Sequence, residues 1–458
     1  MMPEITGVQT SAGRGTRFRP LNLYSPTSMI PKGMMRIMGI PIAELQIEQL
    51  KTCGVKDIYI ITQFHENKEY ISLRFSDGKK RFGLNIHYSD TIADRTNNGS
   101  GDAILTNIEK KKLTGNSIIL PNDNLFEFDL EHVINAHNKS GAVISMLTTT
   151  IRPRETIKTY GLIKTDLSHR VTQLNEKPEN ERELMRALGI SNPTQLDSIR
   201  AIINTAGYII DNDRFREIAK EPWVVEGRKK SSGEFDMAGK FVAGMIERKY
   251  PVFSIPINAW GDFGSTNFFL DTFPDALSGK FPSIHCVLEN QGYYHDSKKN
   301  IWIHPESLRM EDISGMTLKE RMNAGKVKIG PNVFIGRQVT IEEGAEISYS
   351  DIEKNSFIGE GAQIERAYLS PFCEIWPFTE MRECALGQNV IVESSREKRT
   401  YVDGRSVVGS QIIIPAGSHL IGAMVYPGYV FKKEADVTNK KLIPTQKDIM
   451  TLVKQYQK

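Results

Sequence analysis

The chain has 458 residues, of which 40% are hydrophobic and 25% are charged, and its formal net charge is +3. This length predicts two or three domains with sizeable cores. The balanced charge argues against a nucleic-acid-binding protein, which would concentrate Lys and Arg on one face. We find no signal peptide and no run of about 20 apolar residues that could span a membrane. We therefore expect a cytoplasmic protein with no nucleic-acid or membrane partner.

Its four cysteines lack any metal-like spacing and are expected to stay reduced: Cys53, Cys286, Cys373 and Cys384.

The first half of the chain alternates predicted strands and helices. The strands are expected at 5–10, 55–62 and 117–120, and the helices at 42–53, 102–112 and 181–188. Strand, helix and strand in this order form a βαβ unit and imply parallel strands. From about residue 144 to 252 the pattern is mixed. The sequence therefore predicts an α/β fold, a Rossmann-like domain with a mixed sheet.

The chain beyond residue 326 has a different repeat. Apolar residues recur there every five or six positions, with small or turn residues between them: Ile329, Ile335, Ile341, Ile347, Ile352, Ile358, Ile364, Leu369, Ile375, Met381 and Leu386. A period near six with β-branched residues at one phase is typical of the hexapeptide repeats of a parallel β-helix, here expected to be left-handed. A polar break at 394–405 interrupts the repeat, which resumes through Ile412, Ile414, Leu420 and Val425.

These patterns divide the chain into four parts. We predict an α/β domain over 1–278, a linker over 279–326, a β-helix over 327–432 and a tail over 433–458. The tail is expected to hold a short helix at 446–456, since its apolar residues fall on one helical face.

A glycine-rich segment, Ser-Ala-Gly-Arg-Gly-Thr-Arg at 11–17, directly follows the first predicted strand. Glycines let the backbone approach a phosphate closely, so that its N–H groups can donate to it. Arg17 can add two hydrogen bonds to phosphate oxygens. The segment matches neither the dinucleotide fingerprint nor the P-loop.

This segment and the one at 30–35, Ile-Pro-Lys-Gly-Met-Met, together resemble the sugar nucleotidyltransferases, also called NDP-sugar pyrophosphorylases. Their motif is G-x-G-T-R, a short loop and P-K-x-M-L-P. Gln9 and Thr10 precede the motif where this family has apolar or small residues. The resemblance implies catalytic roles for Arg17 and Lys32 at the phosphates. It also implies nucleotide-binding roles for Ala12, Gly13, Gly15 and Thr16.

Later segments resemble the same family in the same order, so the resemblance covers residues 7 to 266. Gly99 and Ser100 look like the segment that meets the nucleotide base at the start of a helix. Asp123 follows the strand predicted at 117–120, at the strand end where open α/β sheets bind ligands. The resemblance implies that Asp123 and Asp262 are magnesium ligands. It implies that the sugar 1-phosphate is bound by Tyr160, Gly161, Glu176, Lys177 and Asn204.

The reaction so implied joins a nucleoside triphosphate (NTP) and a sugar 1-phosphate into an NDP-sugar and pyrophosphate. Two anions must meet, so charge neutralisation and positioning are the main tasks of the protein. Mg²⁺ held by two carboxylates can clamp phosphate oxygens. No general base is required, because the attacking phosphate is already ionised. The β-helix makes the chain similar to glucose-1-phosphate adenylyltransferases and mannose-1-phosphate guanylyltransferases.

Several alternatives stay open at this point. Asp123, Asp262 and Lys177 could each be an ordinary turn residue if taken alone. The chain could be a regulatory paralogue without catalysis, or a bifunctional enzyme whose β-helix transfers an acyl group. The segment at 94–98 lacks the Gln-Pro pair of uridylyl and thymidylyl members, which favours a purine nucleotide. Glucose 1-phosphate is the commonest sugar of the family. The flat β-helix faces favour a homo-oligomer, a tetramer or a dimer.

Overall fold

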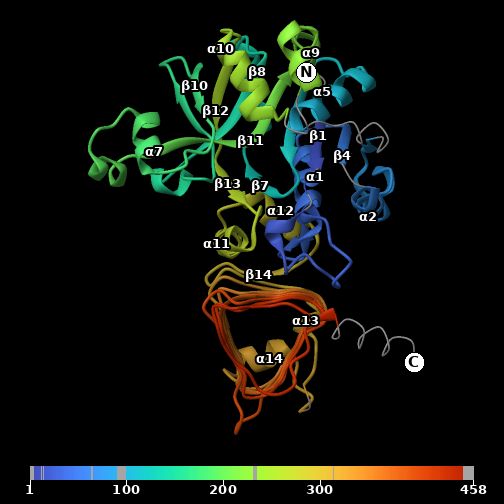
Figure 1. Cartoon of the computed structure of the whole chain (residues 1–458). Helices are drawn as coiled ribbons and strands as arrows, with labels where there is room; N and C mark the ends of the chain where they lie inside the picture. Colours follow the sequence, from blue (N-terminus) through green and yellow to red (C-terminus); the bar gives the residue numbers. More distant parts are fainter. Residues whose placement is uncertain are drawn as a thin grey trace. The chain divides into compact units, whose positions relative to one another are not determined.

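The computed structural model describes residues 5–11, 13, 15–62, 65–89, 99–230, 235–312 and 314–446 (Figure 1). The chain folds into two compact units. The first contains Met1–Gly13 and Gln46–Trp260, and the second contains Arg14–Leu45 and Gly261–Lys458. The second unit therefore combines an early segment of the sequence with the C-terminal half of the chain. The predicted tail helix and the 94–98 segment lie outside the described residues.

A nine-stranded mixed sheet forms the centre of the first unit. Its strands are β1 (Ile5–Ser11), β4 (Asp57–Thr62), β5 (Asn85–Tyr88), β6 (Asn116–Pro121), β8 (Ile144–Ile151), β9 (Leu162–Thr165), β10 (Val171–Asn175), β11 (Ala201–Asp211) and β12 (Val252–Pro256). The order is β10-β9-β11-β6-β1-β4-β5, with β8 pairing both β11 and β12. Strand β1 is parallel to β4 and β6, whereas β11 is antiparallel to β6 and β8. The predicted α/β fold with a mixed sheet is confirmed.

Helices pack on this sheet (Figure 1). They are α1 (Ile42–Thr52), α2 (His65–Phe75), α3 (Lys79–Phe82), α5 (Ser100–Lys111), α6 (Leu130–Ser140), α7 (Glu181–Leu188), α8 (Asn212–Ile218), α9 (Pro222–Lys230), α10 (Ala243–Glu247) and the π-helix η5 (Met237–Val242). Helix α5 buries Ile104, Leu105 and Ile108 against the sheet residues Val8 and Ile119 in one apolar cluster. The helices expected at 42–53, 102–112 and 181–188 are present as α1, α5 and α7.

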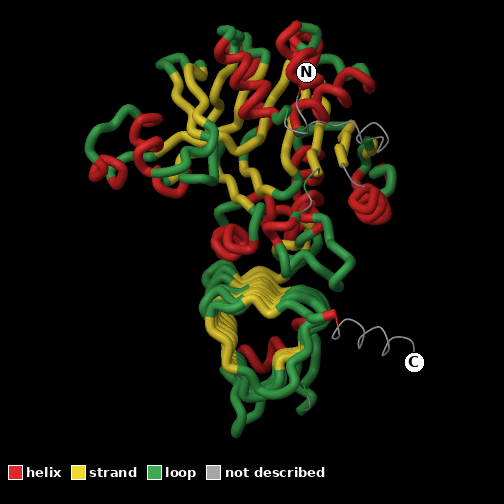
Figure 2. Tube along the Cα trace, viewed as in Figure 1, coloured by secondary structure: helices red, strands yellow, loops and turns green. Residues whose placement is uncertain are grey.

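The second unit contains a β-helix, which Figures 1 and 2 show along its axis, with strands stacked on the sides of a triangle. Its strands are β15 (Ile301–Ile303), β16 (Lys328–Ile329), β17 (Val333–Ile335), β18 (Thr340–Ile341), β19 (Glu346–Ser348), β20 (Asp351–Ile352), β21 (Phe357–Ile358), β22 (Gln363–Leu369), β23 (Glu374–Ile375), β24 (Glu380–Leu386), β25 (Ile391–Val392), β26 (Tyr401–Asp403), β27 (Val407–Val408), β28 (Ile413–Ile414), β29 (His419–Ile421), β30 (Met424–Val425), β31 (Asp436–Thr438) and β32 (Lys441–Leu442). All pairings among them are parallel.

The apolar repeat of the sequence forms the core of this β-helix. Ile341, Ile358 and Ile375 stack in register on successive coils and are fully buried. Residues one coil apart are separated by 17 positions, as in the hydrogen bond from Ala367 to Ser350. The predicted break at 394–405 lies in a longer coil, because Val392 pairs with Ile414. The buried, inward-facing positions therefore stay aligned on both sides of the extra residues at 394–405.

The segment predicted as a linker, 279–326, contains α12 (Pro282–Asn290), β14 (Tyr294–Asp296), β15, α13 (Pro305–Leu308) and α14 (Leu318–Asn323). Strand β15 pairs with β17, so this segment supplies the first strand of the β-helix sheet. Figure 1 shows α14 within the triangle of coils. Leu318 of α14 is fully buried in the β-helix core, so α14 covers the start of that core.

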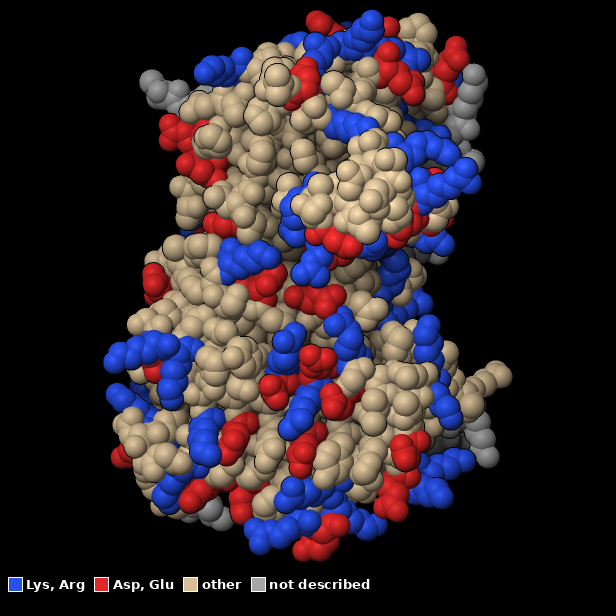
Figure 3. All heavy atoms as spheres, turned by 90° about the vertical axis from the view of Figure 1, so that its left-hand side faces the viewer, with Lys and Arg blue, Asp and Glu red and all other residues tan. Residues whose placement is uncertain are grey.

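The outer faces carry charges of both signs, which are interspersed on the side shown in Figure 3. On the β-helix, ion pairs join successive coils, as between Arg366 and Glu383 at 3.3 Å and between Arg382 and Glu365 at 3.8 Å. Such exposed pairs contribute little to stability, about 0–1 kcal/mol each. No helix in the described part of the chain combines the length and the apolar character needed to cross a membrane.

Candidate active site

The glycine-rich segment passes into the second unit after Gly13, and Gly15 lies just before the short helix η1 (Thr16–Phe18). Gly15 has φ of +65°, a backbone conformation that favours glycine. A Cβ atom here would lie 2.7 Å from Nδ2 of Asn22 and 3.3 Å from Cγ of Lys32. The same Asn22 amide donates to the carbonyl oxygen of Gly15 at 3.3 Å. Gly15 is therefore required so that the Lys32 side chain can pass across the turn.

Lys32 begins the short helix η2 (Lys32–Met34), and its ammonium group donates to the carbonyl oxygen of Gly264 at 3.1 Å. The backbone N–H of Gly264 donates to Oδ1 of Asp262 at 2.5 Å. A Cβ atom on Gly264 would lie 3.6 Å from Nη2 of Arg17. The structure thus brings the predicted residues Arg17, Lys32 and Asp262 together around Gly264.

An aromatic side chain anchors η1. Phe18 is fully buried, and its ring meets that of Phe269 edge-on at 5.4 Å. Phe269 belongs to α11 (Thr266–Leu277), which begins two residues after Gly264 and is capped by the side chain of Ser265. Arg17 is exposed, but the residue that follows it, Phe18, is packed in a core and holds the backbone at Arg17 in place.

In the first unit, Asp123 lies in the turn between β6 and β7 (Asn124–Glu127), past the carboxyl end of β6 as predicted. A buried amide network supports this turn. Nε2 of Gln46 donates to the carbonyl oxygens of Pro121 at 2.7 Å and Asn124 at 2.8 Å. Gln9 donates to Gln46 at 3.1 Å. The polar side chain of Gln9 thus helps to hold the Asp123 turn.

The predicted sugar-phosphate residues gather at one place in the first unit. Strand β11 has a bulge after Asn204, whose backbone N–H donates to the carbonyl oxygen of Gly161 at 3.0 Å. A Cβ atom on Gly161 would lie 2.8 Å from Oε2 of Glu176. The ammonium group of Lys177 lies 3.7 Å from Oε1 of Glu176. Tyr160 packs its ring against that of Trp260 at 5.3 Å.

Two further polar residues join this group: Tyr208, which ends the sugar-site segment that begins at Asn204, and Asp236, which the sequence analysis missed. Tyr208 is buried and accepts a hydrogen bond from Nδ2 of Asn204 at 2.9 Å. Asp236 caps the π-helix η5 through a 2.6 Å hydrogen bond from the N–H of Gly239. Burial raises the pKa of Glu176, and the nearby Asp236 raises it further, whereas Lys177 opposes the shift. Only the helix-capping pattern of Asp236 was visible in the sequence.

The predicted base-binding residues Gly99 and Ser100 open helix α5. The first amides of this helix, those of Gly101 and Asp102, both donate to the carbonyl oxygen of Phe235 at 3.1 and 3.2 Å. A Cβ atom on Gly99 would lie 2.7 Å from that carbonyl group. Glycine at position 99 therefore allows the segment after residue 234 to close over the helix start.

The site residues divide between the two units. Asp123 belongs to the first unit and Asp262 to the second. Gly13 is exposed at the end of the first unit's early segment, and Ala12 lies outside the described residues. In the described part of the chain, no group of three or more His, Cys, Asp or Glu residues could hold a metal ion. The predicted magnesium site uses only two carboxylates, whose oxygens are ligands that Mg²⁺ prefers.

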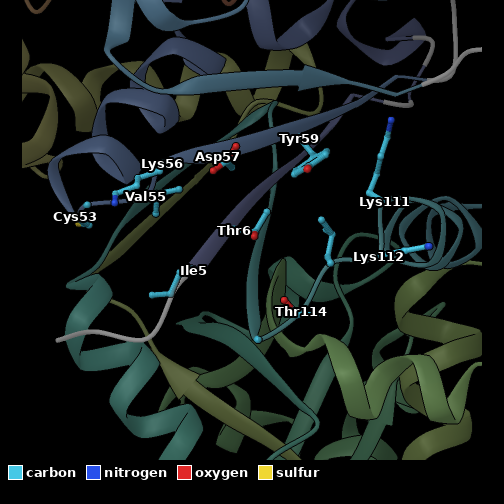
Figure 4. A pocket seen from close by; sticks show the side chains of 13 residues that line it. Ile5, Thr6, Cys53, Val55, Lys56, Asp57, Tyr59, Lys111, Lys112 and Thr114 are labelled. Atoms are coloured by element: carbon cyan, nitrogen blue, oxygen red, sulfur yellow. The ribbon is translucent and has the colours of Figure 1, made fainter.

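A hollow in the first unit lies at the opposite strand ends from these residues. It is lined by residues at the starts of β1 and β4, among them Thr6 and Asp57, and by Lys111 and Lys112 at the end of α5 (Figure 4). Ligands of open parallel sheets bind at the carboxyl ends of the strands, where Asp123 lies. The hollow is therefore separate from the candidate site.

Comparison with known proteins identifies the family of this chain. The sequence model of the nucleotidyl transferase family matches residues 7–279. The chain belongs to the nucleotidyl transferase family. This match begins within β1 and extends beyond α11, so it includes every predicted site residue.

Relatives of this nucleotidyl transferase extend the likeness into the β-helix. A UTP–glucose-1-phosphate uridylyltransferase of Synechocystis is 26% identical over 79% of this chain and 87% of its own length. A glucose-1-phosphate adenylyltransferase 2 of Pseudoalteromonas atlantica is 22% identical over 83% and 86%. A glucose-1-phosphate adenylyltransferase of Fervidobacterium nodosum is 22% identical over 90% and 92%. The predictions that the chain belongs to the sugar nucleotidyltransferases and is a nucleotidyltransferase enzyme are confirmed.

Proposed function

We propose that this nucleotidyl transferase transfers a nucleotidyl group from an NTP to glucose 1-phosphate, giving an NDP-sugar and pyrophosphate. The observation that supports this best is the cluster of Arg17, Lys32 and Asp262 around Gly264. Two cations and a carboxylate at one place suit a triphosphate and its metal ion. The relatives named above act on glucose 1-phosphate.

The reaction forms a bond between a phosphate oxygen of the sugar and the α-phosphorus of the NTP, while the bond to pyrophosphate breaks. Arg17 and Lys32 neutralise the triphosphate, and Lys177 neutralises the incoming sugar phosphate. Glu176 and Asn204 bind sugar hydroxyls, with Tyr160 and Gly161 shaping that side. Since the attacking oxygen is already ionised, no side chain has to remove a proton. Positioning and charge carry the catalysis.

Asp123 and Asp262 would hold Mg²⁺, which supplies charge neutralisation at the phosphates when bound. Gly13, Gly15 and Thr16, with Ala12, would bind the triphosphate through backbone N–H groups. Gly99 and Ser100 would face the base. The relatives include uridylyl and adenylyl enzymes, so the expected purine preference stays a prediction that substrates must test.

Pyrophosphate release tests the proposal. The protein with Mg²⁺ is given ATP, GTP, UTP, CTP or dTTP, each with glucose 1-phosphate or mannose 1-phosphate. We expect release with at least one nucleotide and glucose 1-phosphate. Asp123→Asn should reduce the rate by about 100-fold. Glu131→Gln removes an exposed carboxylate from α6 and should leave the rate unchanged. Silence with every pair would favour the regulatory paralogue, and turnover of acetyl-CoA would favour the bifunctional enzyme.

We further propose that the protein is a cytoplasmic homo-oligomer, a tetramer or a dimer. The β-helix presents long parallel sheets whose ends and faces suit pairing with another copy. Light scattering of the purified chain measures its mass directly. A mass of one chain at micromolar concentration would contradict the proposal.

A further inference from the structure

Four residues after Lys32, the chain forms a tight hairpin within the second unit. Strands β2 (Arg36–Ile37) and β3 (Ile40–Pro41) are antiparallel and joined by Met38 and Gly39. Both turn residues have positive φ, +48° and +82°, as in the two-residue turns that suit hairpins. Ile37, Met38 and Ile40 are buried. The hairpin is therefore packed into the unit.

Two carboxylates of the β-helix hold the tip of this hairpin. The backbone N–H of Met38 donates to Oδ2 of Asp351 at 2.8 Å, and that of Gly39 donates to Oε1 of Glu353 at 2.8 Å. Ile352, between the two, is fully buried in the β-helix core. Side chains alternate along a strand, so Asp351 and Glu353 both point outward from the same face. Each consecutive amide of the turn thus has its own acceptor.

Both carboxylates are almost completely buried, with 0% and 1% exposure. Among the residues that the structure describes, no donor lies within hydrogen-bond distance of Oδ1 of Asp351 or Oε2 of Glu353. Burial raises the pKa of both groups; the neighbouring Glu353 raises that of Asp351 further, and Arg36 opposes both shifts. Buried, incompletely satisfied carboxylates cost stability. On the next coil, Tyr368 occupies the position equivalent to Asp351, so a β-helix coil does not need an acid there.

The groups around the pair complete its setting. Arg36 of the hairpin donates from Nη1 to the carbonyl oxygen of Gly39 at 2.6 Å. Lys354 follows Glu353 in the chain, and its charge lowers the pKa of Glu353. Burial raises the pKa values of the Tyr293 and Tyr368 hydroxyl groups, and the negative charges of Asp351 and Glu353 raise them further. The cations whose charges lower the pKa values of the pair are thus Arg36, which acts on both groups, and Lys354, which acts on Glu353.

The acceptor of the Lys32 hydrogen bond is fixed to the same β-helix. Phe269 of α11 meets Tyr368 edge-on at 4.7 Å, and Asp271 of α11 accepts from Arg405 at 2.8 Å. Helix α11 begins directly after the Gly264–Ser265 pair. The β-helix therefore holds both ends of the Lys32–Gly264 hydrogen bond, one through α11 and one through the hairpin.

We infer that Asp351 and Glu353 are positioning residues for Lys32, acting by fixing the Met38–Gly39 turn; this rests on the proposed function. Only five residues separate Lys32 from the Met38–Gly39 turn. The two sides of the hairpin are joined at its base, since the N–H of Ile42 donates to the carbonyl oxygen of Met35 at 3.0 Å. A displacement of the turn is therefore passed to Lys32. A shift of about 1 Å in a positioning group can reduce a rate about 100-fold.

A double-mutant cycle with amide rescue tests this inference in the full-length chain. Asp351→Ala and Glu353→Ala remove the acceptors and should each lower kcat/KM for the NTP at least tenfold. Asp351→Asn and Glu353→Gln keep an acceptor oxygen and should stay within about threefold of the wild type. In a Lys32→Ala background, the alanine variants should cause no further loss, since they act through Lys32.

A matched control comes from the far coils of the β-helix. Ser418 is fully buried and accepts a hydrogen bond from the N–H of Ala435 at 3.1 Å, so Ser418→Ala also removes a buried acceptor. It should lower the melting temperature without changing kcat/KM. Hydrogen exchange at residues 36–41 should be slow in the wild type and in both amide variants, and faster in both alanine variants.

The outcomes separate this inference from the proposed function. If the wild type is active and the losses multiply in the Lys32→Ala background, the positioning role is wrong. Unchanged exchange at residues 36–41 in the alanine variants would also overturn it. A wild type that is inactive with every substrate would contradict the proposed function instead. The exchange measurement would still test whether Asp351 and Glu353 hold the hairpin in place.

Discussion

The ammonium group of Lys32 lies 3.1 Å from the carbonyl oxygen of Gly264, a residue 232 positions later in the sequence. The backbone N–H of Gly264 makes a second hydrogen bond, which it donates to the carboxylate of Asp262. One glycine thus connects the lysine proposed to neutralise the triphosphate with a proposed magnesium ligand. The geometry of this glycine should control catalysis, which leads to the first prediction.

Gly264→Ala should lower kcat/KM for the NTP at least tenfold. The new Cβ would lie 2.8 Å from Oδ1 of Asp262, closer than real contacts allow, so Asp262 would have to turn away. Steady-state kinetics with varied NTP would measure the loss. The melting temperature should change little, because Asp262 is only partly buried and its displaced carboxylate can reach solvent. An unchanged kcat/KM would separate Asp262 from the reaction.

Gly161→Ala is the matched change on the sugar side. Its Cβ would lie 2.8 Å from Oε2 of Glu176, the same crowding against a different carboxylate. We expect the KM for glucose 1-phosphate to rise about tenfold, with a small change in the KM for the NTP. The two alanine variants therefore serve as controls for each other. Equal effects of both on both substrates would mean that the glycines act only through folding.

Activity should depend on a divalent metal held by Asp123 and Asp262. Removal of metal with EDTA should abolish pyrophosphate release, and added Mg²⁺ should restore it. Asp123→Asn and Asp262→Asn should each raise the Mg²⁺ concentration needed for half-maximal rate. Asp213→Asn removes an exposed carboxylate from α8 and provides the control. Full activity in EDTA would contradict this assignment.

Stability should fall between pH 7.5 and pH 5 because of His137. This side chain is buried against Ser145, and burial lowers its pKa to about 4, from an ordinary value near 6.5. Below the ordinary value the unfolded chain binds the proton and the folded one does not, so stability is lost as the pH falls. The loss should be about 2 kcal/mol by pH 5. Urea unfolding of His137→Asn should show a weaker pH dependence, whereas the exposed His132→Asn should behave like the wild type.

Arg321→Ala should unfold the start of the β-helix. Arg321 is fully buried, pairs with Asp312 at 3.4 Å and donates to the carbonyl oxygens of Ile341 and Met310. Its removal takes a fully buried side chain out of the core and leaves two buried or partly buried carbonyl oxygens without their donor, at a cost of about 3 kcal/mol, while Asp312 keeps its hydrogen bonds from Ser314 and Met316. Thermal unfolding would measure this change. Lys319→Ala on the exposed side of the same helix should have no effect, and a similar effect of both would contradict the role of the buried pair.

Much of the fold follows from local patterns in the sequence. The period near six predicts the β-helix because each inward position must fill the same narrow core, and Ile341, Ile358 and Ile375 do so. Helix α7 has the predicted bounds because Asn180 caps its start and Gly189 its end. The motif residues also predict which side chains meet phosphate, since phosphate chemistry restricts the residue types. Such signals are local, so the sequence alone contains them.

Other features depend on contacts between distant segments. The sequence places Arg17 and Lys32 at the start of an α/β domain, yet the fold assigns them to the unit of the β-helix. Their partner Gly264 and the carboxylates of Asp351 and Glu353 follow hundreds of residues later. In the sequence, Asp351 and Glu353 look like ordinary outward-facing acids of a β-strand. Only packing of the hairpin against that face buries them and gives them acceptor roles, because burial and hydrogen bonding are properties of the folded chain.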